Sequence, residues 1–164
     1  MSKLRTVFAS LDKFEKGGVQ PINDDPRNYV FSNIFEVASK AEPYEKVAVA
    51  RNLEYVLEAI RAEGDSPWFA ASHDEAALVM DGEVEIRLVK PDQQIVGEDR
   101  EGTTILEGTP RGRRMGTIVA RRGHMALLPK GAAYQFSAMS AGVILLQTIK
   151  GDLTVERWKD ICQS

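Results

Sequence analysis

The second half of the chain alternates short apolar runs with turn residues. One apolar run begins at Ala76, meets a tight turn at Asp81-Gly82 and continues as a second run to Val89. Asp-Gly between apolar runs predicts a β-hairpin, because glycine adopts positive φ without a Cβ clash. Further short runs at 116–120, 125–128, 135–138 and 143–150 predict strands. Strands this short and this evenly separated are typical of a sandwich or a jelly-roll barrel, so the pattern predicts an all-β fold.

Residues 46–62 are compatible with two structures. Leu53, Val56, Leu57 and Ile60 fit one face of a helix, whereas the Val, Ile and Tyr content suits strands. We interpret the segment as strands, because the turn residues that follow it lead directly into the predicted hairpin.

The segments that flank these strands have a different character. Residues 1–45 predict an irregular N-terminal arm, in which turn residues surround an apolar segment at 29–37. Such an arm could wrap its own barrel or a partner chain. Residues 90–115 are polar and predict a long loop or an exposed hairpin, and 153–161 predicts a short C-terminal helix. We therefore expect an arm at 1–45 and a single barrel domain at 46–164.

Composition narrows the class of protein. The chain has 164 residues, enough for one hydrophobic core, with 43% apolar and 27% charged residues. A net charge of -3 provides no basic field for phosphates, so we expect no nucleic-acid partner. We find no signal peptide and no membrane-length apolar run, which favours a cytoplasmic protein. The single cysteine, Cys162, excludes an internal disulfide.

Two groups of residues carry a recognisable spacing. Gly123, Pro129 and Gly131 enclose a predicted strand, and Glu75 precedes Gly82 by seven residues. Proline fixes φ and glycine relieves the bend where such a strand leaves its turn. This spacing resembles the two signatures of cupins, and the resemblance implies a double-stranded β-helix, which is a jelly-roll barrel.

The cupin signatures also mark where metal ligands belong, and the chain lacks most of them. The two histidine positions before Glu75 fall at 69 and 71, or at 68 and 70 in the other register. The second signature places a histidine at 134 and an asparagine at 138. The residues present there are Phe69 and Ala71, or Trp68 and Ala70, followed by Tyr134 and Ala138. We expect Phe69, Ala71, Glu75 and Tyr134 to be vestigial metal-site positions, filled mostly by space-filling groups. A buried Glu75 would then need a hydrogen bond from Tyr134 or His73.

A reduced metal site remains an alternative. The chain has two histidines, so a three-histidine centre is excluded. His73, Glu75 and His124 could form a two-histidine, one-carboxylate iron site. His73 and Glu75 would point the same way on a strand. The competing interpretation makes His124 a turn residue after Gly123 and His73 a residue at a strand end.

A longer resemblance concerns one family. Residues 64–75, 79–86 and 23–31 are similar to the small subunit of two-component hydroquinone 1,2-dioxygenases. That family opens the ring of para-hydroxylated phenols. The resemblance implies a hetero-oligomer, such as a heterotetramer, with a larger cupin subunit that holds Fe(II). It implies a small aromatic substrate at or near the interface, and no metal or catalytic residue in this chain. Trp68 is our candidate for a side chain contributed to the partner's substrate pocket; alternatively it plugs its own barrel or an interface.

Three functions follow from these observations. The first is the non-iron subunit of an Fe(II)-dependent, ring-cleaving aromatic dioxygenase. The second is a stand-alone, metal-free cupin that binds a small molecule in its barrel. The third is an independent metalloenzyme that uses His73, Glu75 and His124. The first accounts for the exchanged ligands and for the local resemblance, so we favour it.

Overall fold

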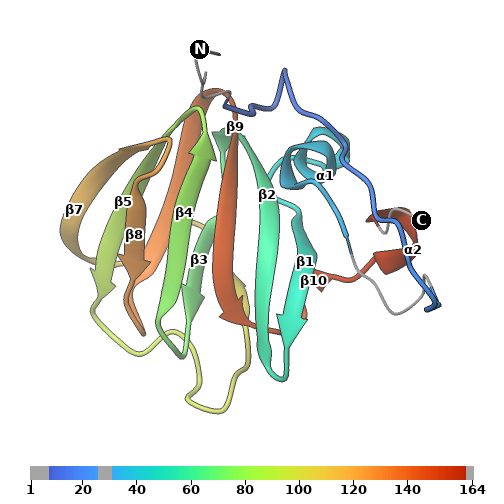
Figure 1. Ribbon diagram of the computed structural model, residues 1–164. Coiled ribbons are helices and arrows are strands. Elements are labelled where there is room, and N and C mark those ends of the chain that lie inside the picture. Colours follow the sequence, from blue (N-terminus) through green and yellow to red (C-terminus); the bar gives the residue numbers. More distant parts are fainter. Residues whose placement is uncertain (1–7, 26–30, 162–164) are drawn as a thin grey trace.

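Two β-sheets face each other across a shared interior in the computed structural model (Figure 1). The structure describes residues 8–25 and 31–161; Cys162 and part of the apolar segment 29–37 lie outside them. The elements in chain order are α1 (Ile34–Lys40), β1 (Lys46–Asn52), β2 (Tyr55–Asp65), β3 (Trp68–Ala71), β4 (Glu75–Asp81), β5 (Glu83–Pro91), β6 (Thr103–Leu106), β7 (Gly112–Arg121), β8 (Met125–Leu128), β9 (Ala133–Ile149), β10 (Thr154–Val155) and α2 (Trp158–Ile161). The all-β jelly-roll barrel predicted from the sequence is confirmed, with a short helix near its C-terminal end.

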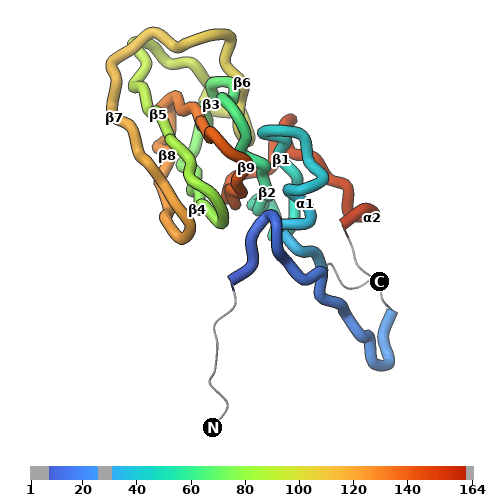
Figure 2. Tube along the Cα trace, turned by 90° about the horizontal axis from the view of Figure 1, so that it is seen from above, coloured from blue at the N-terminus to red at the C-terminus, as the bar shows by residue number. Residues whose placement is uncertain are grey.

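One strand joins the two sheets. β9 has 17 residues, and its first half pairs with β3 and β5 while its second half pairs with β2 and β4. We call β7-β5-β9-β3-β6 the back sheet and β8-β4-β9-β2-β1-β10 the front sheet. Seen from above in Figure 2, the chain closes around the interior. The runs predicted at 135–138 and 143–150 are therefore one bent strand, since a sheet that curls over on itself needs a strand common to both layers.

The predicted hairpin at Asp81-Gly82 is wrong in its pairing. β4 and β5 flank Gly82 directly, but β4 pairs with β8 and β9, and β5 pairs with β7 and β9. The chain thus turns a corner from the front sheet to the back sheet. Gly82 has φ of 75°, and a Cβ there would lie 3.0 Å from the Cα of Gly142. Glycine is needed at this position because two backbones approach closely there, not because a two-residue hairpin forms.

Two other expectations need correction. Of the two alternatives for 90–115, the exposed hairpin is partly right, because β5 and β7 pair antiparallel at the ends of this segment. The strand β6, which pairs with β3, was not expected. The interpretation of 46–62 as strands is confirmed by β1 and β2. Leu53 occupies the turn between them with φ of 57° and is 85% exposed, so its apolar side chain does not belong to a buried face.

The predicted helix at 153–161 starts later, at Trp158, after the short strand β10.

Part of the described arm lies against its own barrel, while the stretch that ends at residue 25 extends away from it (Figure 2). The side chain of Asn33 caps α1 by accepting a hydrogen bond from the backbone N–H of Phe35. Val37 packs with Val47 of β1, and the backbone N–H of Leu11 donates to Asp81 at 2.7 Å. None of the helices in residues 8–25 and 31–161 is long and apolar enough to span a bilayer.

The corner at Gly82 can be tested by substitution. We expect Gly82→Ala to lower the free energy of unfolding by about 1–2 kcal/mol, because alanine resists positive φ and its methyl group would press on Gly142. The measurement is urea unfolding followed by circular dichroism. Gly116→Ala is the matched control, since an added Cβ there meets nothing within 4 Å. Equal losses for the two variants would contradict this account of the corner.

Candidate functional site

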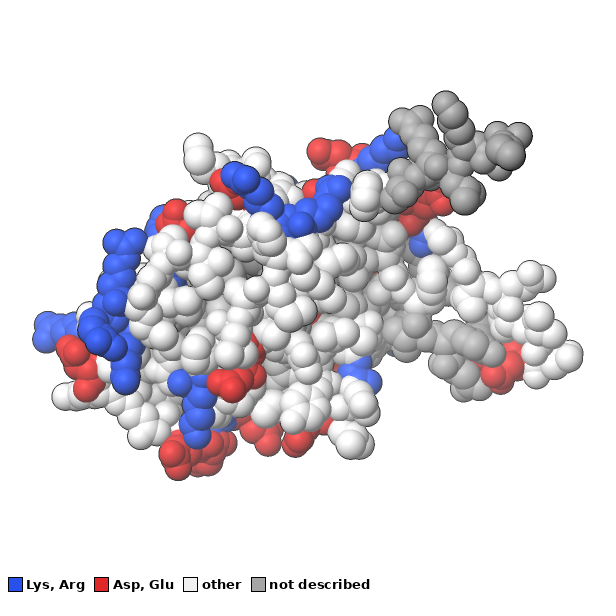
Figure 3. Space-filling model, turned by 60° about the vertical axis from the view of Figure 1, so that its left-hand side comes forward, with Lys and Arg blue, Asp and Glu red and all other residues white. Residues whose placement is uncertain are grey.

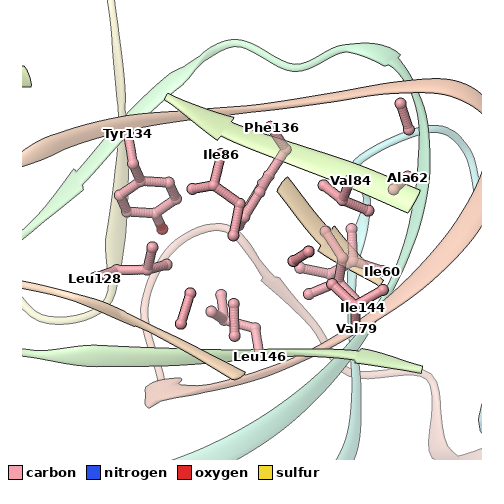
Figure 4. Packing of buried hydrophobic residues seen from close by; sticks show 14 of the residues in the cluster. Ile60, Ala62, Val79, Val84, Ile86, Leu128, Tyr134, Phe136, Ile144 and Leu146 are labelled. Atoms are coloured by element: carbon pink, nitrogen blue, oxygen red, sulfur yellow. The ribbon is translucent and has the colours of Figure 1, made fainter. Parts of the chain in front are cut away.

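The four residues predicted at vestigial metal-site positions come together in the barrel interior. Phe69, Ala71, Glu75 and Tyr134 are each at most 3% exposed. Phe69 and Tyr134 are register partners on β3 and β9, and their ring centroids lie 5.7 Å apart. In Figure 4, Tyr134 and Leu128 point into the same interior space as the rest of the cluster. Apolar and aromatic groups thus occupy the place where the cupin signatures put histidine ligands.

Glu75 is the polar centre of this interior. Its Oε1 accepts hydrogen bonds from the hydroxyls of Thr103 and Thr148, and its Oε2 accepts one from the hydroxyl of Tyr134, each at 2.6 Å. The donors come from β6 and from the two halves of β9. The carboxyl group therefore ties β4 to strands of both sheets. Satisfying a buried carboxyl in this way removes most of the penalty for taking it out of water.

Tyr134 remains a neutral donor. Burial raises the pKa of its phenol well above 10, and the nearby Glu75 carboxylate raises it further. The Tyr134 hydroxyl therefore keeps its proton over the ordinary pH range. This favours a structural hydrogen bond over proton transfer, since a phenol with so high a pKa is a poor general acid or base near neutral pH.

His73 extends the network by one step. Its Nε2 lies 2.9 Å from the Thr148 hydroxyl oxygen and 3.2 Å from the backbone nitrogen of Ile149. The backbone N–H of Ile149 donates to Nε2, so Nε2 of His73 acts as an acceptor in that hydrogen bond. The Nδ1 atom of His73 is buried without a hydrogen-bond partner among the described residues.

His124 does not join this network. It is exposed just before β8, where its Nδ1 accepts a hydrogen bond from the backbone N–H of Arg121 at 2.9 Å. Its backbone oxygen pairs with Val79, four residues along β4 from Glu75. Four residues of strand span about 13 Å. The alternative iron site of His73, Glu75 and His124 is therefore not brought together, because β8 holds its histidine at the other end of β4.

A buried ion pair was missed at the level of sequence. Lys46 and Glu58 are 3% and 1% exposed, and Lys46 Nζ lies 3.7 Å from Glu58 Oε2 and 4.8 Å from the centre of the Phe69 ring. The Thr154 hydroxyl donates to Glu58 Oε1 at 2.7 Å. Burial raises the pKa of the Glu58 carboxyl against the opposing effect of Lys46. The sequence did contain a signal that Glu58 is buried. Glu58 alternates with Val56 and Ile60, so strand periodicity places it on the same, buried face of β2.

Trp68 lies on the outer side of the back sheet. It is half-buried at the start of β3, where it pairs with Leu106 of β6. Its neighbour Phe69 points into the barrel, so alternation turns Trp68 outward. Trp68 belongs to none of the buried clusters formed by the described residues. The alternative in which it plugs its own barrel does not fit this position.

Comparison with known proteins places the chain in a family. No protein-family model and no curated protein sequence matches it. A chain of hydroquinone 1,2-dioxygenase PnpCD, solved with Cd²⁺ and 4-hydroxybenzonitrile, is 53% identical with a TM-score of 0.94, and the match covers 100% of this chain and 99% of that one. A chain of the hydroquinone 1,2-dioxygenase from Sphingomonas sp. TTNP3, solved with 4-hydroxybenzoate, is 55% identical with a TM-score of 0.95 and 99% coverage of both. The chain belongs to the hydroquinone 1,2-dioxygenase family.

A second kind of hydroquinone 1,2-dioxygenase chain shares the fold. In a structure of PnpCD with Fe³⁺, a longer chain matches 85% of this chain with a TM-score of 0.63 and 11% identity, but only 38% of its own length takes part. At this identity the likeness shows the fold alone. PnpCD therefore contains one chain of about the present length and a longer one that includes a similar barrel.

The residues of this chain do not suit an iron ion. Iron of this class takes imidazole and carboxylate ligands, whereas Phe69 and Ala71 offer no donor and Tyr134 is held protonated. Glu75 already uses both oxygens in hydrogen bonds. Within residues 8–25 and 31–161, no three His, Cys, Asp or Glu residues are grouped to hold a metal. The interior is arranged as a packed core that holds the Glu75 hydrogen-bond network and the Lys46–Glu58 ion pair.

The network can be tested through Tyr134. We expect Tyr134→Phe to lower the free energy of unfolding by about 1–3 kcal/mol, because Oε2 of buried Glu75 loses its donor. Urea unfolding at neutral pH measures the change. Tyr55→Phe removes the same hydroxyl from a side chain that is 51% exposed and should alter stability little. A Tyr134→Phe protein as stable as the wild type would show that the hydrogen bond contributes nothing net.

Proposed function

We propose that this chain is the small, non-iron subunit of an Fe(II)-dependent hydroquinone 1,2-dioxygenase. The enzyme would open the ring of a para-hydroxylated phenol with O₂ as a hetero-oligomer, a heterotetramer in the simplest case, with a larger barrel subunit holding the iron. The observation that carries the proposal is the full-length likeness to two such enzymes, at 53% and 55% identity. The exchanged ligand positions support it, because they leave the iron chemistry to another chain.

The interior supports a structural role for this subunit. Glu75 is satisfied by hydroxyl groups, and aromatic rings fill the space around it. The competing function, a stand-alone cupin with a small molecule in its barrel, needs that same space. Tyr134, Phe136 and Ile86 are each at most 1% exposed there, so the packing favours a subunit that acts through its surface.

The first test follows iron and turnover. The chain should be purified alone and after co-expression with the larger hydroquinone dioxygenase subunit. We expect iron and hydroquinone-dependent oxygen uptake in the co-expressed complex alone, measured by elemental analysis and an oxygen electrode. Stoichiometric iron in the chain alone would overturn the assignment. A stable chain that binds no larger subunit and retains a small molecule would favour the stand-alone function.

The second test concerns Trp68. We propose that its outward indole forms one wall of the larger subunit's substrate pocket, where a flat ring can stack on a phenol. We expect Trp68→Ala to lower kcat/KM by up to about tenfold, the effect of about 1.4 kcal/mol of lost contact. Assembly and iron content should stay unchanged. Trp68→Phe, which keeps a ring, should recover most of the activity. Loss of assembly in Trp68→Ala would make Trp68 an interface residue instead.

A further inference from the structure

The outer side of the front sheet carries a set of apolar side chains that its own chain leaves exposed or only partly buried. Met125 is 68% and Leu127 is 59% exposed on β8, although the two residues between and after them, Ala126 and Leu128, are buried. Alternation alone places a polar residue at such outward positions in a solvated sheet. Two neighbouring outward apolar residues on a short edge strand call for a reason beyond folding.

These residues continue across the sheet in register. Met125 pairs with Leu78, which pairs with Leu145; Leu127 pairs with Ala76, which pairs with Gln147, and Gln147 pairs with Leu57. We call the set formed by Met125, Leu127, Ala76, Leu78, Leu145 and Leu57 the apolar face. It covers strands β8, β4, β9 and β2. Strands lie about 4.8 Å apart, so four of them span about 14 Å.

The apolar face contains no charged residue. It adjoins an open seam of the barrel, by which we mean the line between β7 and β8, two strands that do not pair with each other. Figure 3 brings forward the side with β7 and β8, and the middle of that side shows no Lys, Arg, Asp or Glu. Across the seam, Ile118 and Val119 of β7 are 36% and 52% exposed. Among the described strands β7 pairs with β5 and β8 with β4, so each has a free edge facing the seam. Free edges beside apolar residues are sites where another chain packs.

The outer side of the back sheet has the opposite character. Arg87 bonds to Glu85 at 2.6 Å and to Gln135 at 3.1 Å, and a looser ion pair joins it to Asp65. Such a charged, hydrogen-bonded surface is already satisfied in water. Obligate interfaces are more apolar than the remaining surface. A permanent partner is therefore expected on the front sheet.

We propose that the apolar face is the main docking surface for the larger subunit, packed against an apolar sheet of that subunit's barrel. This inference rests on the proposed function. The longer chain of PnpCD contains a similar barrel, which can present a sheet for face-to-face packing. The face is a set of side chains across four strands of one sheet, and such a surface packs against the face of another sheet.

The two contacts with the larger subunit are then separate. Trp68 is on the back sheet and the apolar face on the front sheet, so the apolar face carries assembly and Trp68 contributes to the substrate pocket. A partner that reaches both must extend beyond one barrel. The longer chain does, since its match to this chain takes up 38% of its length.

The test compares two exposed methionines. We expect Met125→Glu to weaken binding of the larger subunit by roughly thirtyfold or more, the effect of losing a central interface contact. Met139→Glu is the matched control: Met139 is 106% exposed on β9, outside the apolar face, and binding should change by less than about twofold. Titration by biolayer interferometry measures both, and thermal unfolding of each variant alone should match the wild type.

A cross-link identifies the occupant. With p-benzoylphenylalanine in place of Leu127, irradiation of the co-expressed complex should give an adduct with the mass of this chain plus the larger subunit. An adduct of two copies of this chain, or unchanged affinity of Met125→Glu, would overturn the inference while leaving the proposed function intact. Failure of the proposed function gives a different result, because the wild-type chain itself would then neither bind the larger subunit nor support hydroquinone-dependent oxygen uptake.

Discussion

The barrel is organised around one buried carboxyl group. Glu75 is 1% exposed and accepts hydrogen bonds from Thr103, Thr148 and Tyr134, which lie on strands of both sheets. A buried carboxyl without such partners would destabilise the fold by several kcal/mol on the usual scale of ~2–7 kcal/mol for an unsatisfied polar group. The Glu75 carboxyl group therefore constrains where β4, β6 and β9 lie relative to one another. In a metal-binding barrel the ion would impose a similar constraint, and here hydroxyl groups do so.

The long strand β9 makes this arrangement possible. Its first half supplies Tyr134 to the interior from the back sheet, and its second half supplies Thr148 from the front sheet. Both residues fall on the inward side because alternation is kept along each half of the strand. The corner at Gly82 closes against Gly142 of the same strand, so β9 also fixes where the front sheet passes into the back sheet.

Packing groups stand where the cupin signatures have metal ligands, so under the proposed function this chain acts through its surface. An interior filled by Phe69, Tyr134 and Phe136 is rigid and closed, which suits a subunit whose contribution is made at its faces. The two outer sheet faces differ in chemistry, since one is apolar and the other carries the Arg87 ion pairs. That difference distinguishes an apolar surface suited to permanent assembly from a surface whose charged groups around Arg87 already have partners.

Sequence alone determined the fold class and the nature of the candidate site. Spacing of Gly123, Pro129, Gly131 and Glu75 located the barrel signatures, and residue identity at 69, 71 and 134 showed that imidazole ligands were missing. Only the tertiary structure decided which strands pair across Gly82, that Thr103 and Thr148 meet Glu75, and that Lys46 and Glu58 share the interior. The reason is physical: alternation tells which side of a strand a residue faces, whereas its partners depend on pairings between segments distant in the chain.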